Sequence, residues 1–124
     1  MAHQGKVQLL YVTAAPAALV EEGKRLFASH AKWMQATHHR SGPKALLSYN
    51  VSTAPEPADI WNEGNGSTGR TLFILQEIYE TKAGVEDHQR QAQENWQDYG
   101  AYVAWLQKCE IRGVGNSTIQ QSLW

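Results

Sequence analysis

The chain contains very little cysteine and has no excess of charge of either sign. Cys109 is the only cysteine among 124 residues, so no disulfide can form within the chain. Eleven basic residues balance twelve acidic ones to a formal net charge of -1. The basic patch typical of nucleic-acid binding is therefore missing, and we expect no nucleic-acid partner.

Long apolar runs are also missing. The longest run, Pro16 to Val20 with the alanines before it, falls far short of the ~20 residues that span a bilayer, so we expect no membrane segment. Residues 1–5 lack the charged and apolar regions of a signal peptide. Together with the single cysteine, this predicts a cytoplasmic location.

The residues that are present indicate a globular chain. Hydrophobic residues make up 42% of the sequence and charged residues 19%, with five Trp and five Tyr. This composition favours folding around a core, and the length suits one domain better than two. We predict a single domain over residues 1–124.

Side-chain periodicity predicts four strands and two helices. Alternating residues predict strands over 6–13, 44–53, 70–80 and 110–116. Apolar residues at steps of three or four predict one helix over 16–40 and a second that follows a capping Thr81 and extends to Leu106. Segment 54–69, rich in Pro, Gly, Asn and Ser, is predicted to be a long loop and a candidate lid, whose prolines end the pairing of the strand before it.

This order of elements predicts the fold class. Strand, helix, strand, strand, helix, strand is the α+β, ferredoxin-like βαββαβ arrangement, in which a four-stranded antiparallel sheet carries both helices on one face. The other face is left uncovered. Because monomers rarely expose large apolar patches, we expect a homodimer through that face.

Two residues of the predicted core carry ionisable side chains. Glu77 shares a strand face with Phe73, Leu75 and Tyr79, so burial would raise its pKa unless a partner compensates. His88 lies on the apolar stripe of the second helix. There it is a candidate proton acceptor from a phenol, or a structural partner of Glu77 that closes the helix onto the sheet.

The sequence around these two residues resembles that of a known family. Leu75-Gln76-Glu77-Ile78-Tyr79-Glu80, then Val85-Glu86-Asp87-His88, then Trp96, Tyr99 and Tyr102, is similar to the antibiotic biosynthesis monooxygenase family of dimeric α/β-barrel proteins. The resemblance implies a homodimer with its sheets face to face and a pocket in each subunit between helices and sheet. It also implies activities such as oxygenation of phenolic or quinol substrates, haem degradation or polyketide cyclisation, in several cases with no bound cofactor.

Two rows of side chains are candidates for the walls of such a pocket. Trp96, Tyr99 and Tyr102 follow each other at helical spacing and would stack on a planar ligand, or form plain core. His30 and Met34, with His38 one turn further, share a helix face that would suit a haem or an aromatic ligand, or the core.

We expect no metal at His38-His39. Neighbouring helical residues point about 100° apart, and no Cys or second carboxylate joins these two at ligand spacing. We expect no cofactor either.

The leading hypothesis is a cofactor-independent oxygenase for a small aromatic, quinol or polyketide-like molecule, with His88 as proton acceptor and molecular oxygen as co-substrate. Glu77, Trp96, Tyr99, Tyr102, His30 and Met34 are the predicted ligand-binding residues. One alternative is a non-catalytic module, stress-related or otherwise, that binds a small apolar ligand. Another is a protein of the same fold that binds haem through His30, His38 or His88.

Overall fold

The computed structural model describes residues 2–124, apart from the side chain of Val114. Its elements, in chain order, are β1 (Val7–Ala15), a 3-10 turn η1 (Ala17–Leu19), α1 (Val20–Thr37), β2 (Leu46–Pro57), a 3-10 turn η2 (Glu63–Asn65), β3 (Ser67–Tyr79), α2 (Lys82–Asn95), α3 (Tyr99–Gln107) and β4 (Glu110–Thr118). The sheet has the order β2-β3-β1-β4, and all neighbouring strands are antiparallel. The predicted α+β class with an antiparallel open sheet is confirmed, and the strand order is compatible with a ferredoxin-like fold.

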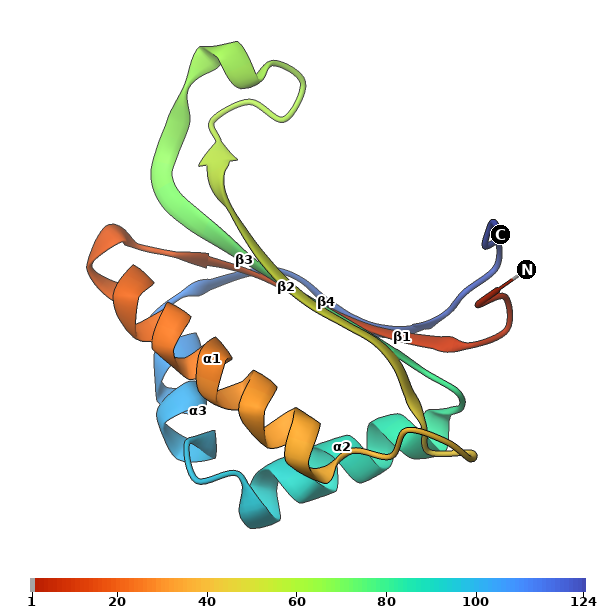
Figure 1. Cartoon of the computed structure of the whole chain (residues 1–124). Coiled ribbons are helices and arrows are strands. Elements are labelled where there is room, and N and C mark those ends of the chain that lie inside the picture. Colours follow the sequence, from red (N-terminus) through yellow and green to blue (C-terminus); the bar gives the residue numbers. More distant parts are fainter. Residues whose placement is uncertain (1) are drawn as a thin grey trace.

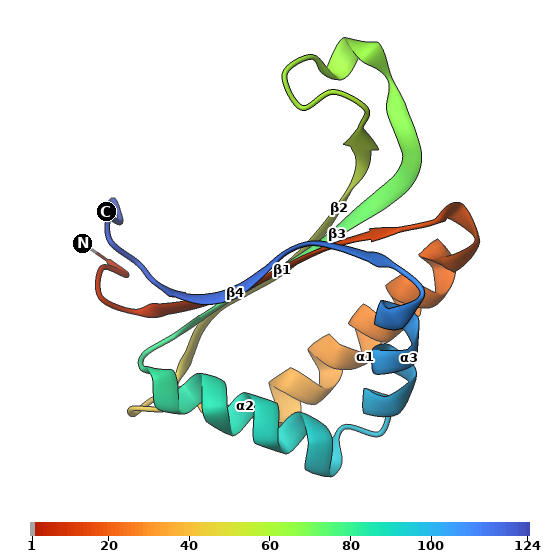
Figure 2. The ribbon, with the colours of Figure 1, turned by 180° about the vertical axis from the view of Figure 1, so that it is seen from behind.

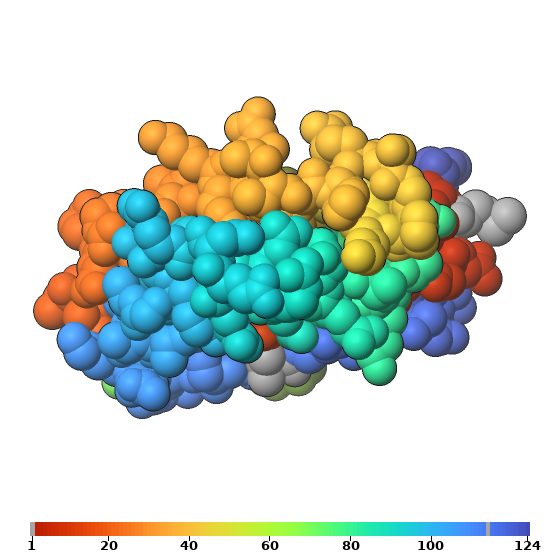
Figure 3. Space-filling model, turned by 90° about the horizontal axis from the view of Figure 1, so that it is seen from below, coloured from red at the N-terminus to blue at the C-terminus, as the bar shows by residue number. Residues whose placement is uncertain are grey.

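The molecule has two layers. All three α-helices lie on one side of the sheet, and the tip of the β2–β3 hairpin extends on the other side (Figures 1 and 2). Seen from the helical side, the helices lie against one another and cover that face (Figure 3). No helix within residues 2–124 combines the length and apolar character needed to cross a membrane.

Alternation along β1 and β3 builds the face that receives the helices. Leu9 pairs with Glu77 and Thr13 with Phe73, so these four side chains point to the same side. All four are buried. The central strand β3 therefore carries a carboxyl group into an otherwise apolar layer.

The second predicted helix is in fact two helices. Thr81 caps α2 as predicted, since its hydroxyl accepts a hydrogen bond from the amide of Ala83. The helix ends at Asn95, because Trp96 has an extended backbone, and α3 begins after Asp98. The aromatic row that we placed on one helix is thus divided between the break, with Trp96, and α3.

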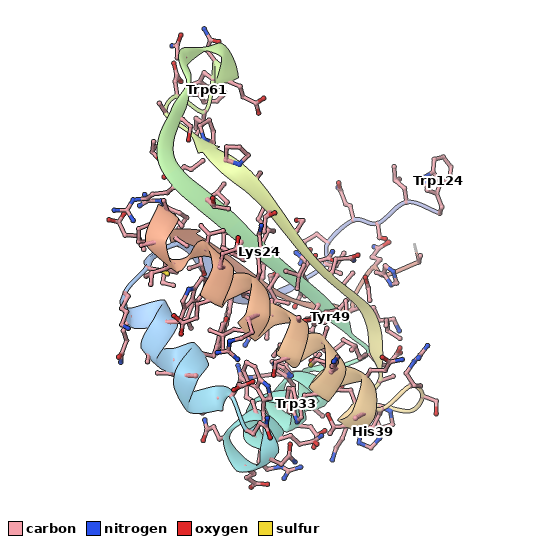
Figure 4. The ribbon with its side chains drawn as sticks, turned by 60° about the vertical axis from the view of Figure 1, so that its left-hand side comes forward. Lys24, Trp33, His39, Tyr49, Trp61 and Trp124 are labelled. Atoms are coloured by element: carbon pink, nitrogen blue, oxygen red, sulfur yellow. The ribbon has the colours of Figure 1, made fainter. Side chains whose placement is uncertain are left out.

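The predicted loop over 54–69 is shorter, because β2 continues to Pro57 and β3 begins at Ser67. Pro55 pairs with Thr71 and Pro57 with Ser67, so the prolines do not end the sheet pairing. β2 is an edge strand, where a missing amide donor is tolerated on the solvent side. The hairpin carries the exposed Trp61 at its tip, away from the helices, so it is not a lid over the helical side (Figure 4).

The first predicted helix is shorter than 16–40. Pro16 precedes the 3-10 turn, and α1 ends at Thr37, whose hydroxyl donates to the carbonyl oxygen of Trp33. His38 has an extended backbone, and Gly42 has a φ of 84° in the turn that follows. The chain leaves the helix at Thr37, before the predicted end at residue 40.

α1 approaches α3 and the sheet most closely at Gly23. A Cβ atom there would lie 2.5 Å from Cζ2 of Trp105 and 2.8 Å from the end of the Phe73 ring. Both rings are fully buried, so neither has room to move away. Only a glycine fits at this crossing.

We expect Gly23→Ala to destabilise the fold by about 1–3 kcal/mol, the usual range for overpacking a core. Gly100→Ala is the matched control, because a Cβ at this exposed position of α3 meets nothing within 4 Å. The control should be neutral or stabilising by up to about 1 kcal/mol through helix propensity. Urea unfolding measures both changes, and equal stabilities for the two variants would contradict the close packing described here.

Candidate functional site

A cavity of about 250 Å³ lies between the helices and the sheet. Its walls are formed by Tyr11, His30, Leu75, His88, Gln89, Ala92, Gln93, Trp96, Tyr99, Tyr102, Val103 and Leu106. Five of the predicted site residues, namely His88, Trp96, Tyr99, Tyr102 and His30, thus line one cavity. The break between α2 and α3 forms one of its walls.

The other two predicted ligand-binding residues lie elsewhere. Met34 is buried and lines a separate hollow of about 370 Å³ together with His38 and Tyr49. Glu77 does not line the cavity, but its Oε1 lies 3.8 Å from Nε2 of His88. Met34 therefore belongs to the packing of α1 on β2, and Glu77 lies behind the cavity wall.

Two tryptophans hold the break between α2 and α3 against α1. The Trp33 and Trp96 rings stack with their centroids 5.8 Å apart. The indole of Trp33 donates to Oδ1 of Asn95 at 2.6 Å, and that of Trp96 donates to Oγ of Ser29 at 3.1 Å. Figure 4 shows Trp33 extending from α1 towards α2. These contacts place the Trp96 ring beside His30, with centroids 4.9 Å apart.

A chain of hydrogen bonds joins the end of α1 to α2. The Thr37 hydroxyl donates a hydrogen bond to the backbone carbonyl of Trp33. Its oxygen therefore accepts a hydrogen bond from Nδ1–H of His38 at 2.9 Å. In a neutral His38 this leaves Nε2 as an acceptor, 2.8 Å from Nδ1 of His88. His88 therefore carries its proton on Nδ1, and its Nε2 lone pair points towards Glu77.

Glu77 is buried with few partners. Its Oε1 accepts a hydrogen bond from the Tyr79 hydroxyl at 2.5 Å, and its Oε2 has no hydrogen-bond partner. Burial raises the pKa of Glu77 to about 7, although the Tyr79 hydrogen bond works in the opposite direction. Near neutral pH the carboxyl group is therefore close to the midpoint of its titration.

Burial acts in the opposite sense on the neighbouring imidazoles. It lowers the pKa of His30 to about 3 and that of His38 to about 4. For His88, burial and the nearby His30 and His38 lower the pKa to about 3. All three rings are therefore neutral at pH 7 and present one lone pair each.

The structure also gathers groups that sequence reasoning did not connect. Nδ1 of His30 lies 2.7 Å from the Tyr49 hydroxyl, and the Tyr49 side chain points from β2 towards α1 (Figure 4). Potential ligand atoms of His30, Glu77 and His88 all lie within 4.8 Å of one another. The role of Tyr49 was missed because it follows from strand register and from the position of α1 over the sheet. Tyr79 was placed on the strand face of Glu77, but its hydrogen bond to that residue was not predicted.

We compared the chain with profiles of protein families, with curated protein sequences and with solved structures, and found no match. The site must therefore be interpreted from its own chemistry.

We expect the free energy of unfolding to decrease as pH falls from 6.5 to 5. The unfolded histidines titrate near 6.5, whereas the folded ones stay neutral, so the unfolded state binds more protons in this window. Each fully buried histidine contributes at most about 1.4 kcal/mol per pH unit. The contribution of Glu77 to this pH dependence has the opposite sign, because its pKa is raised in the folded state and protonation below pH 7 stabilises the fold. This single group offsets only part of the contribution of the three histidines.

Urea unfolding at pH 6.5, 6 and 5 measures this dependence. His88→Gln should make the free energy of unfolding less dependent on pH. His39→Gln, at an exposed position, should leave this dependence unchanged. A midpoint that stays constant or rises on acidification would show that the histidines are not buried in neutral form.

Proposed function

We propose that this protein is an oxygenase of the antibiotic biosynthesis monooxygenase type that acts on a small phenolic or quinol molecule. The substrate would bind in the cavity between the helices and the sheet. One atom of molecular oxygen would enter the substrate and the other would leave as water, with the electrons supplied by the substrate itself. The reaction needs no organic cofactor.

The observation that carries the proposal is the chemistry of the cavity walls. Trp96, Tyr99 and Tyr102 offer aromatic surface, and His30 and His88 supply polar groups at the same cavity. A volume of about 250 Å³ is below the roughly 300–1,000 Å³ of pockets for drug-sized ligands. This favours a ligand of one or two rings and disfavours haem.

His88 is the proposed proton acceptor. By itself it is a weak base, since its pKa is lowered to about 3. An imidazolium formed at Nε2 would lie 3.8 Å from Glu77, and an ionised carboxylate at that distance stabilises it. We therefore propose that His88 and Glu77 work as a pair, in which Glu77 positions and stabilises the proton on His88.

The alternative is a module that binds the same kind of ligand without turnover. Nδ1 of His88 is engaged by His38, and the whole chain back to Thr37 links α1 to α2. This network alone gives His88 a structural role. The two functions share the cavity and differ only in oxygen consumption.

We also propose that two copies associate through the uncovered sheet face. On that face Val12 of β1 pairs with Ile74 of β3, and Leu10 follows two residues before Val12. Next to Leu10, the side-chain amide of Gln76 donates a hydrogen bond to that of Gln8. The three apolar side chains are half-buried in the single chain. A second copy would remove the rest of their surface from water.

The catalytic proposal predicts oxygen uptake with hydroquinone or α-naphthol in chelator-treated protein. His88→Ala should lower the rate at least about 100-fold, the lower range for loss of a general base. The control is His39→Ala, which removes an exposed histidine and should keep the full rate. An oxygen electrode measures the rates, and circular dichroism checks that each variant is folded.

Full activity in His88→Ala would remove this residue from the mechanism. If the wild-type protein binds α-naphthol, seen as quenching of tryptophan fluorescence, but consumes no oxygen, the non-catalytic alternative is correct. If neither occurs, the cavity is not a site for small phenols.

The dimer proposal predicts a solution mass twice that of the 13.9-kDa chain, measured by light scattering after size exclusion. Ile74→Glu should give a monomer, because it places a charge at the centre of the proposed interface. Ala28→Glu, on the exposed surface of α1, should leave the mass unchanged. A dimer that persists in Ile74→Glu would exclude this face.

A further inference from the structure

Three groups that commonly bind metals meet behind the cavity wall, each from a different element. His30 comes from α1, Glu77 from β3 and His88 from α2, and all three are buried. One potential ligand atom from each lies within 4.8 Å of the other two. Two imidazoles and one carboxylate at such distances form a compact donor set.

The hydrogen bonds leave lone pairs facing one another inside this set. Nδ1 of His88 is used in the bond to His38, so Nε2 presents a lone pair to Oε1 of Glu77 at 3.8 Å. That oxygen already accepts from Tyr79 and has no proton to offer when ionised. The separation is too long for a direct hydrogen bond. Nε2 of His88 and Oε1 of Glu77 are thus two hydrogen-bond acceptors that face each other with no donor between them, an arrangement that a cation would stabilise.

The second oxygen of Glu77 supplies an independent observation. Oε2 is fully buried and has no hydrogen-bond partner. Among residues 2–124, no Lys or Arg lies within ion-pair distance of this carboxylate, and His88 is its only ion-pair partner. A buried carboxylate that has one hydrogen-bond donor, no cation and one oxygen without a partner is costly, and such an oxygen usually has a partner or a ligand.

We propose that His30, Glu77 and His88 bind one divalent first-row transition-metal ion. Two histidines and a carboxylate are a ligand set that suits Fe²⁺, Co²⁺ or Zn²⁺ and leaves coordination positions open. His30 and His88 also line the cavity, so the ion would lie next to the cavity wall.

The surroundings match what metal-bound histidines need. The second ring nitrogen of such a histidine usually has a hydrogen-bond partner that fixes the ring. Here Nδ1 of His30 contacts the Tyr49 hydroxyl and Nδ1 of His88 contacts His38, which leaves Nε2 of each ring for the ion. Metal–ligand bonds of about 2.1 Å place donors roughly 3.4 Å apart, so the set contracts by about 1.4 Å at most on binding.

This inference goes beyond the proposed function and does not depend on it. The lone pair at Nε2 of His88 takes either a proton or a metal ion, so metal-loaded protein cannot use His88 as the proton acceptor. Oxygen uptake by chelator-treated protein tests the proposed function, and metal binding tests this site. Either can fail while the other holds.

The test is a titration of untagged, chelator-treated full-length protein with Co²⁺, followed by visible absorption, and with Zn²⁺, followed by calorimetry. We expect one ion per chain. His88→Ala and the nearly isosteric Glu77→Gln should each weaken binding more than about 100-fold, and Tyr49→Phe, which removes only the partner of His30, about 10-fold. His39→Ala should change the affinity less than about 2-fold, because this exposed histidine lies outside the set.

The absence of a Co²⁺ absorption band in the wild-type protein would overturn the proposal, and so would equal affinities in the wild type and Glu77→Gln. If His88→Ala does not fold, Glu77→Gln and Tyr49→Phe still test the metal-binding proposal, since both replacements are nearly isosteric. Binding that His39→Ala abolishes would place the ion on the surface instead.

Discussion

The burial of one carboxyl group is the constraint on which the rest of this site depends. Glu77 lies on β3, at the centre of the sheet, and exposes none of its surface. No apolar side chain can satisfy it, so the helices above must bring polar groups to this point. His30 from α1 and His88 from α2 lie at this point, although neither makes a hydrogen bond to the carboxyl group, whose one donor is Tyr79 of the same strand.

The early end of α1 makes this arrangement possible. Because Thr37 bonds back to Trp33 and the backbone turns extended at His38, the imidazole is placed 2.8 Å from His88. The hydrogen bond from the Thr37 side chain to the backbone thus accompanies the end of α1, and the His38 imidazole then connects α1 to α2.

The two side-chain periodicities were enough to predict which residues face the core. A period of two placed Glu77 among Phe73, Leu75 and Tyr79, and helical steps placed His88 on an apolar stripe. The break before α3 was not predictable in this way, because Trp96 and Tyr99 keep helical spacing across it. The Tyr49–His30 contact depends on the register between β2 and β3 and on where α1 lies over them. Neither can be read from one strand.

The charge balance of the site determines what it can accept. Nε2 of His88 and Oε2 of Glu77 offer lone pairs, whereas the lone pair of His38 is used by His88 and the hydroxyls of Tyr49 and Tyr79 are already engaged. A ligand that approaches Nε2 of His88 must therefore bring a proton or a positive charge. A phenol hydroxyl meets this requirement, and so does a metal cation, whereas a carboxylate or phosphate would face repulsion from ionised Glu77. The aromatic walls limit the size of any ligand, and the polar groups behind them favour a hydrogen-bond donor or a cation beside His88.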